Sequence, residues 1–418
     1  MGALPPIPGL RRDDGELADD VVPFRTLDDC RRILALAEAA VAAGSASALV
    51  LGGGLLGLEA AHGLAGRGLR VTVLHAVGHL MERQLDPDAG AMLAATLRAL
   101  GVAVELNAVT RRVESTADGV TAVLGDGRCL TADLLVVACG IQPETGLATD
   151  AGLVVDRGIV VDAGLRTSDP RIHAIGDCAQ HAGQLGGLVA PAWDQARVVA
   201  DLVTGVDPNA RYVPRPVVTR LKAAGIDLAA MGDSTGEPGG DAVTFRDPRR
   251  GTYAKLVLRD DRLVGAILLG DNPLVGTVIQ TFDRGAPVID PRSLLLGRAG
   301  VGGGGPAPEV SPALIPDATV ICQCNTVTKR ALVRCWQDGA RSTAELMAAT
   351  RAGTGCGTCR DAVDGIATWL SRGEGASGSA RAAESGRERT EEPSAVPALA
   401  GTGGTPAGRQ ARAKGSTA

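Results

Sequence analysis

The stretch that decides the fold is Ala48-Leu-Val-Leu-Gly52-Gly53-Gly54-Leu-Leu-Gly57-Leu-Glu59. An apolar run of strand character ends in a glycine turn of the form G-x-G-x-x-G, and a run of helical character follows it. In such a turn Gly52 would allow the tight bend, Gly54 the close approach of a pyrophosphate, and Gly57 the close packing of helix on strand. The free N–H groups and the dipole at the helix N-terminus would attract the pyrophosphate. The turn, with Gly53 at its centre, therefore predicts a site for a nicotinamide dinucleotide.

Strands and helices alternate on both sides of this turn. Helical patterns cover 28–43, 56–67 and 86–100, and strand patterns cover 47–51, 69–74, 103–106, 119–124 and 134–138. Elements of this length in this order predict an α/β fold whose parallel sheet is covered on both faces.

The residue at the end of the second strand leaves the preference between NADH and NADPH undecided. That strand ends in Val73-Leu-His75, where a site for NAD usually offers Asp or Glu to the ribose 2′-hydroxyl. An imidazole cannot accept a hydrogen bond in the same bidentate way. We interpret His75 as a loop residue near the adenosine.

Composition excludes several classes of protein. The chain has 418 residues, enough for two to four domains, a net charge of −5 and only 2% aromatic residues. A protein that stacks nucleic-acid bases on aromatic side chains, or that binds anionic membranes through a basic surface, is therefore not expected. No apolar run reaches the length of a membrane span and no secretory signal is present, so we expect a cytoplasmic protein. Nine cysteines in such a chain indicate free thiols and metal ligands.

Composition also divides the chain into seven parts. They are a short Pro-rich segment (1–27), the nucleotide domain (28–150), a second α/β piece (151–207), an α+β domain (208–300), a Gly/Pro linker (301–318), a cysteine module (319–372) and a tail (373–418) expected to be disordered. The second piece contains a buried strand over 171–175 that ends in Gly176-Asp177, and a helix over 191–203. The α+β domain contains a hairpin over 253–269.

The cysteine module carries two cysteine pairs, Cys322-Gln-Cys324 and Cys356-Gly-Thr-Cys359. A helix over 328–337, a second beginning at Ser342 and a third ending near 370 would place both pairs on loops at one end of a small helical unit. Four thiolates can then bind one metal centre, and the spacing permits zinc as well as an iron–sulfur cluster. Cys335 lies inside a helix, and we do not expect it to be a ligand.

Residues 47–207 resemble the second nucleotide-binding half of the pyridine-nucleotide-disulfide oxidoreductases, most specifically at Gly176-Asp177. The resemblance implies that Asp177 contacts FAD, while Gly176 allows its close approach. It further implies that Glu59 contacts the nicotinamide carboxamide as the catalytic residue, that Gly140 lines the nucleotide channel, and that the helix beginning near Trp193 points at the flavin.

The family also has an earlier Rossmann unit that holds the ADP part of FAD, and the first residues of this chain resemble the segment that follows it. We therefore expect half of an FAD site, weak FAD binding, and a first half supplied by a longer gene product or a separately encoded chain. The redox cysteines of the disulfide reductases belong to that unit. Cysteines outside the module are expected to be structural thiols: Cys30, Cys129, Cys139 and Cys178.

The order of the parts, and the cysteine module itself, resemble the large subunit of NAD(P)H-dependent nitrite reductases and the electron-transfer subunit of assimilatory nitrate reductases. The stretches that carry this resemblance include Leu80-Met-Glu-Arg-Gln-Leu-Asp86, Gly187-Leu-Val-Ala-Pro191 and Gly353-Thr-Gly-Cys-Gly-Thr-Cys359. The resemblance implies a flavoprotein of two dinucleotide domains, a small α+β domain and a domain similar to bacterioferritin-associated ferredoxin. A [2Fe–2S] cluster would be held by Cys322, Cys324, Cys356 and Cys359. The family's sirohaem domain has no counterpart here.

This reading implies electron transfer from NAD(P)H through FAD and the [2Fe–2S] cluster to a nitrate or nitrite reductase, in a chain that could form a homodimer. Two other readings stay open at this point. One is a ferredoxin or rubredoxin reductase, or a subunit of an opine-type amine dehydrogenase. The other is a non-catalytic, metal-binding remnant without flavin.

Overall fold

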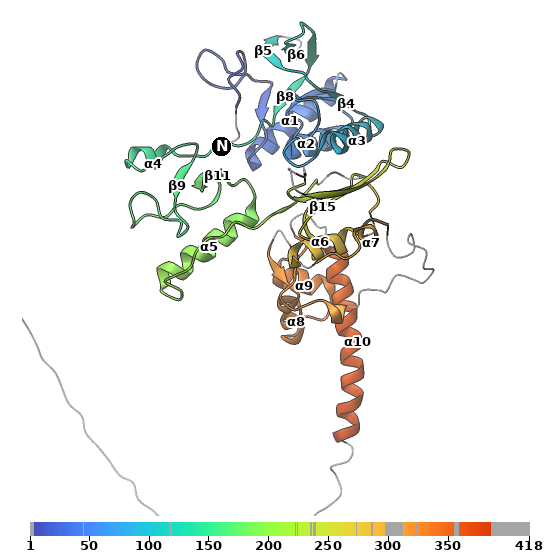
Figure 1. Cartoon of the computed structure of the whole chain (residues 1–418). Helices are drawn as coiled ribbons and strands as arrows, with labels where there is room; N and C mark the ends of the chain where they lie inside the picture. The colour runs from blue at the N-terminus through green and yellow to red at the C-terminus, as the bar shows by residue number, and fades with distance from the viewer. Residues whose placement is uncertain are drawn as a thin grey trace, which may run out of the picture.

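The computed structural model describes residues 4–385 with short gaps. Residues 45, 117–118, 222, 224, 235, 237–239, 273, 286, 297–311, 323–324 and 355–358 lie outside the description, and for residues 374–385 only the backbone is described. The body of the molecule is a stack of a parallel sheet with its helices, an antiparallel sheet and a small helical module, with a lobe beside it (Figure 1).

A five-stranded parallel sheet forms the centre of the nucleotide unit, which comprises residues 21–137. Its strand order is β1-β8-β2-β3-β4, and every neighbouring pair runs parallel. The strands are β1 (Val21–Pro23), β2 (Ser47–Leu51), β3 (Arg70–Leu74), β4 (Val102–Glu105) and β8 (Leu134–Val137). The expected α/β fold is confirmed.

The two faces of this sheet are covered by different kinds of structure. Helices α1 (Leu27–Ala43), α2 (Leu55–Ala65) and α3 (Pro87–Ala99) lie on one face, and an antiparallel sheet of β5 (Thr110–Thr116), β6 (Gly119–Leu124) and β7 (Cys129–Ala132) lies on the other. Because successive side chains of a strand point to opposite faces, Ala48 and Val50 of β2 pack with the helices while Leu49 and Leu51 pack with β5–β7. Both faces are covered as predicted, one of them by strands.

The segment before residue 28 differs from the prediction. Instead of standing apart as residues 1–27, it supplies the edge strand β1, which pairs with β8, and buries Leu10 and Ala18 against the strand-covered face. A three-residue strand carries too short an apolar pattern to be recognised. Strands β5 and β7 were missed as well, because most side chains of β5 are exposed and polar and β7 has only four residues.

A side lobe (residues 146–212) lies beside the nucleotide unit (Figure 1). It contains α4 (Gly146–Asp150), β9 (Ile159–Val161), the short helix η1 (Gly176–Cys178), β10 (Ala179–His181), β11 (Gln184–Leu185) and α5 (Val189–Thr204). The helix expected over 191–203 is confirmed. The buried strand expected over 171–175 is wrong: this stretch makes a single bridge, between Arg166 and His173, and Ile172 and Ile175 are exposed. Among the described residues, no strand pairs with this stretch beyond that one bridge.

An antiparallel sheet over 218–269 packs beneath the helices of the nucleotide unit. Its order is β12-β13-β16-β15-β14, formed by β12 (Val218–Arg220), β13 (Leu228–Gly232), β14 (Asp241–Asp247), β15 (Thr252–Arg259) and β16 (Arg262–Leu269). The predicted hairpin is β15–β16, and Asp260 and Asp261 both have positive φ, as a two-residue type I′ turn requires. Tyr253 and Ile267 share one core with Leu93 of α3, and α6 (Val275–Arg284) covers the other face, with α7 (Pro291–Leu296) nearby.

The cysteine module follows the short helix η3 (Pro312–Leu314) and has its own core. It consists of β17 (Val320–Cys322), β18 (Val327–Thr328), α8 (Lys329–Gln337), α9 (Thr343–Thr350) and α10 (Arg360–Ser385). Thr328 and Ser342 cap α8 and α9 as their positions predict. Helix α10 extends past residue 373, where we expected disorder to begin. Residues 386–418 lie outside the described chain.

Among the helices that the structure describes, none is both long enough and apolar enough to cross a membrane.

Candidate functional site

The glycine turn lies between the carboxyl end of β2 and the start of α2. Gly52 has a φ of 117°, and a Cβ at this position would lie 2.4 Å from the carbonyl oxygen of Ala138. A Cβ at Gly57 would lie 2.0 Å from the carbonyl oxygen of Gly52. The turn, the first turn of α2 and the chain after β8 therefore pack too closely for a side chain at either glycine.

Gly54 faces open space. It is the N-cap residue of α2, it offers no side chain to cap the helix, and no atom lies within 4 Å of the place that a Cβ would occupy. The N–H groups of the first helical turn are thus directed to a region into which the backbone allows close approach. This is the arrangement that a pyrophosphate fits.

His75 lies directly after β3 and is turned into the glycine turn. Its side chain is buried, and Nδ1 accepts a hydrogen bond from the Gly53 N–H at 3.1 Å. Nε2 lies 3.0 Å from the carbonyl oxygen of His79 and 3.2 Å from a carboxylate oxygen of Glu82. His75 lies in a loop as expected, and both of its ring nitrogens have partners inside the protein. A contact between His75 and the coenzyme stays a prediction.

Glu59 and Gly140 flank the turn from two elements. Glu59 is half-buried on α2, one turn beyond Gly54. Gly140 follows β8, which pairs with β2, so that it lies at the same carboxyl edge of the sheet as the turn. Gly140 has a φ of 102° and open space around it. The roles assigned to both residues stay predictions.

The residues expected at the flavin come together in the side lobe. The Gly176 N–H donates to Oε1 of the buried Gln195 at 2.6 Å, which fixes η1 against α5. The Asp177 carboxylate forms an ion pair with Arg25. Trp193, in the first turns of α5, is 53% exposed. Gly176, Asp177 and Trp193 thus lie at one end of the lobe, and their contacts with FAD stay predictions.

Two contacts bring this end of the lobe next to the sheet edge that carries the glycine turn. Arg25 follows β1, which lies beside β8, and it reaches across to Asp177. A Cβ at Gly187 would lie 3.2 Å from Ile141, the residue after Gly140. Sequence reasoning missed Arg25, whose only signal is a positive charge after a short apolar strand.

Two of the four predicted cluster ligands lie within the described residues. Cys322 and Cys359 are buried in the core of the cysteine module, at 1% and 7% exposure, whereas Cys324 and Cys356 fall in the undescribed stretches. Buried thiols that share one small core fit a thiolate-bound centre. With two ligands outside the description, the described residues contain no group of three potential metal ligands.

Asn325 connects the two cysteine loops. Its Nδ2 donates to the carbonyl oxygen of Arg351 at 2.6 Å and to the hydroxyl oxygen of Thr354 at 3.2 Å, and it lies 3.9 Å from the sulfur of Cys322. The loop that contains Cys322 is thereby tied to the loop that precedes Cys356. Sequence reasoning missed Asn325, although its place directly after the Cys-x-Cys pair is a signal.

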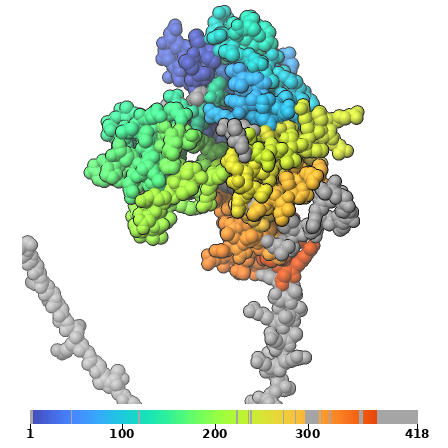
Figure 2. All heavy atoms as spheres, in the orientation of Figure 1, coloured from blue at the N-terminus to red at the C-terminus, as the bar shows by residue number. Residues whose placement is uncertain are grey.

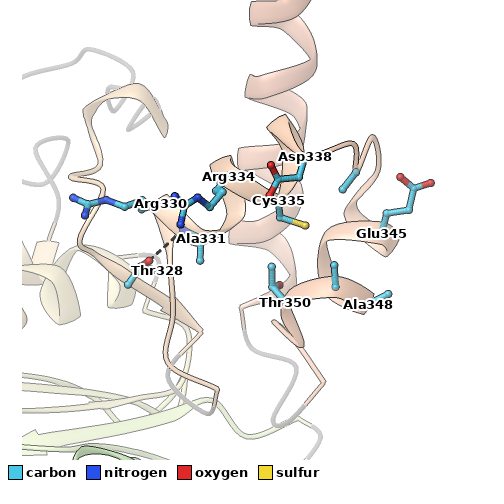
Figure 3. Close-up of a pocket in the computed structure, with 11 residues that line it drawn as sticks. Thr328, Arg330, Ala331, Arg334, Cys335, Asp338, Glu345, Ala348 and Thr350 are labelled. Carbon is cyan, nitrogen blue, oxygen red and sulfur yellow. Dashed lines mark hydrogen bonds between the residues drawn. The ribbon is translucent and has the colours of Figure 1, made fainter. Parts of the chain in front are cut away.

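Cys335 occupies a different place from the paired cysteines. Figure 3 shows its sulfur pointing into a groove between α8 and α9, and this groove has a volume of about 890 Å³. Burial, and after it the charge of Asp338, raises the pKa of this thiol. Cys139, which follows β8, lies at the surface, and desolvation by neighbouring atoms raises the pKa of its thiol to about 11, so it is not an activated nucleophile.

Three family models match the chain. Residues 1–196 match the pyridine nucleotide-disulphide oxidoreductase model, residues 217–280 the rubredoxin NAD+ reductase C-terminal domain, and residues 320–368 the BFD-like [2Fe–2S] binding domain.

Similar proteins include three bacterial enzymes. The NAD(P)H nitrite reductase of Bacillus subtilis (strain 168) is 34% identical over 376 residues, which are 87% of this chain and 44% of that protein. The electron transfer subunit of the assimilatory nitrate reductase of the same organism is 33% identical over 373 residues, 88% of this chain and 46% of that protein. The NADH nitrite reductase large subunit of Escherichia coli (strain K12) is 35% identical over 368 residues, 86% of this chain and 42% of that protein. The chain thus spans less than half the length of each.

Two solved reductases share the fold. The NAD-dependent persulfide reductase from A. fulgidus superposes with a TM-score of 0.59 at 27% identity, over 68% of this chain and 56% of that chain. A putidaredoxin reductase covalently joined to putidaredoxin superposes with a TM-score of 0.56 at 27% identity, over 66% of both chains. The chain therefore carries a pyridine nucleotide-disulphide oxidoreductase domain over residues 1–196, a rubredoxin NAD+ reductase C-terminal domain and a BFD-like [2Fe–2S] binding domain.

Proposed function

We propose that this chain is an electron-transfer oxidoreductase that oxidises NAD(P)H and delivers electrons to the catalytic subunit of a nitrate or nitrite reductase. One observation carries the proposal: a dinucleotide turn with an open helix N-terminus and a four-cysteine module lie on the same chain. The order of these parts is shared with the nitrite and nitrate reductase relatives, and this supports the nature of the final acceptor.

Each part has its own residues for this task. The backbone at Gly54 and the first turn of α2 would bind the coenzyme pyrophosphate, and Glu59 would orient the nicotinamide carboxamide. Gly176 and Asp177 would hold the flavin nucleotide. Four thiolates would hold the cluster: Cys322, Cys324, Cys356 and Cys359. When bound, FAD accepts the two electrons of a hydride, and a [2Fe–2S] cluster passes electrons singly.

The test measures metal content and electron flow in the full chain, which is co-expressed with a first Rossmann unit that holds the ADP part of FAD, purified anaerobically and supplied with FAD. We expect about two irons and two sulfides per chain, and reduction of the cluster by NADH or NADPH followed by electron paramagnetic resonance. Cys356→Ser should lose the cluster, and the matched control Cys335→Ser should keep it. Stoichiometric zinc without a visible chromophore would contradict the cluster, and a cluster that NAD(P)H cannot reduce would favour the non-catalytic alternative.

The nature of the acceptor is a separate question, because the antiparallel domain matches a rubredoxin reductase domain. Steady-state reduction of rubredoxin, a ferredoxin and a nitrate reductase catalytic subunit by the same preparation separates the two readings. Faster turnover with rubredoxin than with the nitrate or nitrite reductase would favour the rubredoxin reductase alternative.

We further propose that the side lobe receives a second nucleotide-binding unit, which completes the FAD site. The support is the exposure of apolar side chains beside Gly176-Asp177: Ile172, Ile175, Leu188, Val189 and Trp193. An apolar patch next to half of a ligand site is typical of a covered interface. The unit could belong to a longer form of this protein or to a partner chain. Co-expression with such a unit should raise FAD retention, and unchanged retention would contradict the proposal. That the chain forms a homodimer stays a prediction, which light scattering would test.

A further inference from the structure

Gly53, the central residue of the glycine turn, is held through both of its backbone polar groups by residues 75–81. The Gly53 N–H donates to His75 Nδ1 at 3.1 Å, and the Gly53 carbonyl oxygen accepts from the Met81 N–H at 3.0 Å. A Cβ at Gly53 would lie 2.6 Å from Leu80 and 2.8 Å from the His75 ring. The orientation of the two peptide groups that flank Gly53 therefore depends on the segment that contains His75.

These contacts determine which nitrogen of His75 carries the proton. A backbone N–H can only donate, so Nδ1 must present its lone pair to Gly53. The proton of the neutral ring is then on Nε2, which faces two acceptors, the His79 carbonyl oxygen at 3.0 Å and the Glu82 carboxylate at 3.2 Å. The neutral Nε2–H form satisfies every contact of the ring.

A second proton would break this arrangement. It would place an N–H on Nδ1 directly against the N–H of Gly53, and two donors cannot share a hydrogen bond. Glu82 faces the opposite side of the ring and would attract the cation toward itself. The other titratable groups near the ring are engaged elsewhere: the His79 ring lies against the carbonyl oxygen of Leu85, and Glu105 of β4 pairs with Arg128.

We propose that His75 is a positioning residue of the coenzyme site whose neutral ring holds Gly53, so that Gly54 and the start of α2 face the pyrophosphate. Loss of this acceptor releases the turn and weakens NAD(P)H binding. This inference rests on the proposed function, and it replaces the expected contact of His75 with the adenosine by an indirect role.

The test measures NADH and NADPH binding to the full chain by calorimetry. His75→Leu removes the acceptor and should bind both coenzymes about tenfold more weakly than wild type, because one hydrogen bond is lost and a buried donor is left without a partner. His75→Asn keeps an acceptor where Nδ1 stands, so it should bind nearly as wild type. His62→Leu, on α2, is the matched control and should behave as wild type.

A result that would overturn the inference is wild-type binding by His75→Leu, or binding by His75→Asn as weak as that of His75→Leu. Nitrogen NMR of the 15N-histidine-labelled chain gives a second measurement, made without coenzyme. His75→Asn identifies the signal of His75 among the five histidines, and that signal should show the Nε2–H form. The Nδ1–H form would overturn the inference. Wild type that shows the Nε2–H form yet binds neither coenzyme would instead overturn the proposed function, and with it the coenzyme role of His75.

Discussion

The nucleotide unit and the side lobe follow each other in the chain but differ in how they bury their apolar side chains. All four residues of β8 are buried, and both faces of its sheet are covered. In the lobe only a small cluster is buried, around Leu165 and Tyr212. Of the nineteen large hydrophobic side chains exposed among the described residues, ten lie between Leu147 and Val206.

This difference shows that the two halves of the proposed site, one in the nucleotide unit and one in the side lobe, are stabilised in different ways. The nucleotide unit is closed by its own elements and by the antiparallel sheet beneath it, so its glycine turn is fixed by packing. The lobe presents an apolar surface and is visible as a separate bulge beside the body (Figure 2). We infer that substitutions in the packed interior of the nucleotide unit change the stability of the chain, whereas substitutions on the surface of the lobe change what the chain binds.

The largest effect is expected from Gly57→Val. The new side chain would collide with the backbone oxygen of Gly52, and backbone cannot move aside as a flexible side chain can. We expect a loss of about 3 kcal/mol or more in the free energy of unfolding, measured with denaturant. Gly54→Val is the matched control, because the space around Gly54 is open. It should unfold as wild type but lose NAD(P)H binding, and unaltered coenzyme affinity would remove the turn from the site.

The next effect is expected where the nucleotide unit meets the antiparallel sheet. Asp86 caps α3 through the N–H of Ala89 at 2.9 Å and also accepts from the Tyr253 hydroxyl at 2.6 Å and from Lys255 Nζ at 3.0 Å. Because these groups are mostly buried, Asp86→Ala should cost about 3 kcal/mol in the free energy of unfolding. Asp88→Ala, which removes an exposed partner of Arg246, is the control and should cost little. Equal effects of the two would mean that the domains are not joined here.

The same carboxylate gives a smaller effect that depends on pH. Burial alone would raise the pKa of Asp86, but hydrogen bonds from Tyr253, Ala89 and Lys255 together hold it below its usual value. The stability that this provides is present above the pKa of the unfolded chain, about 4, and is lost as the pH falls through the lower value of the folded chain. Urea unfolding of Asp86→Asn should therefore lose less stability below about pH 4 than wild type does. An identical acid dependence would contradict the assignment.

The smallest effect on stability is expected in the lobe. Val189→Ser and Trp193→Ser replace side chains that are 62% and 53% exposed, so the free energy of unfolding should change by about 0.5 kcal/mol or less. Leu93→Ala in the core of the nucleotide unit is the matched comparison and should cost about 2–5 kcal/mol. The lobe variants should reduce FAD retention when the second nucleotide-binding unit is supplied. A large loss of stability in either would mean that the lobe is closed by this chain alone.

The sequence by itself determined the nucleotide unit, the β15–β16 hairpin and the helices of the cysteine module. These depend on local patterns: apolar strands, a glycine turn, the pair Asp260-Asp261, and the caps Thr328 and Ser342. It also identified the glycines at which the backbone packs too closely to leave room for a side chain. Such features can be predicted because neighbouring residues in the chain fix them.

Only the tertiary structure decided the features that depend on residues far apart in the chain. Strand β1 can be identified only through its pairing with β8. The strand predicted over 171–175 does not form, because among the described residues no strand pairs with it beyond one isolated bridge. The Arg25–Asp177 ion pair joins residues that are 152 positions apart. His75 illustrates the limit best: its position after β3 could be predicted, but the direction of its ring is set by a hydrogen bond to a turn 22 residues earlier. Side-chain direction follows from packing and hydrogen-bond partners, which a local pattern does not contain.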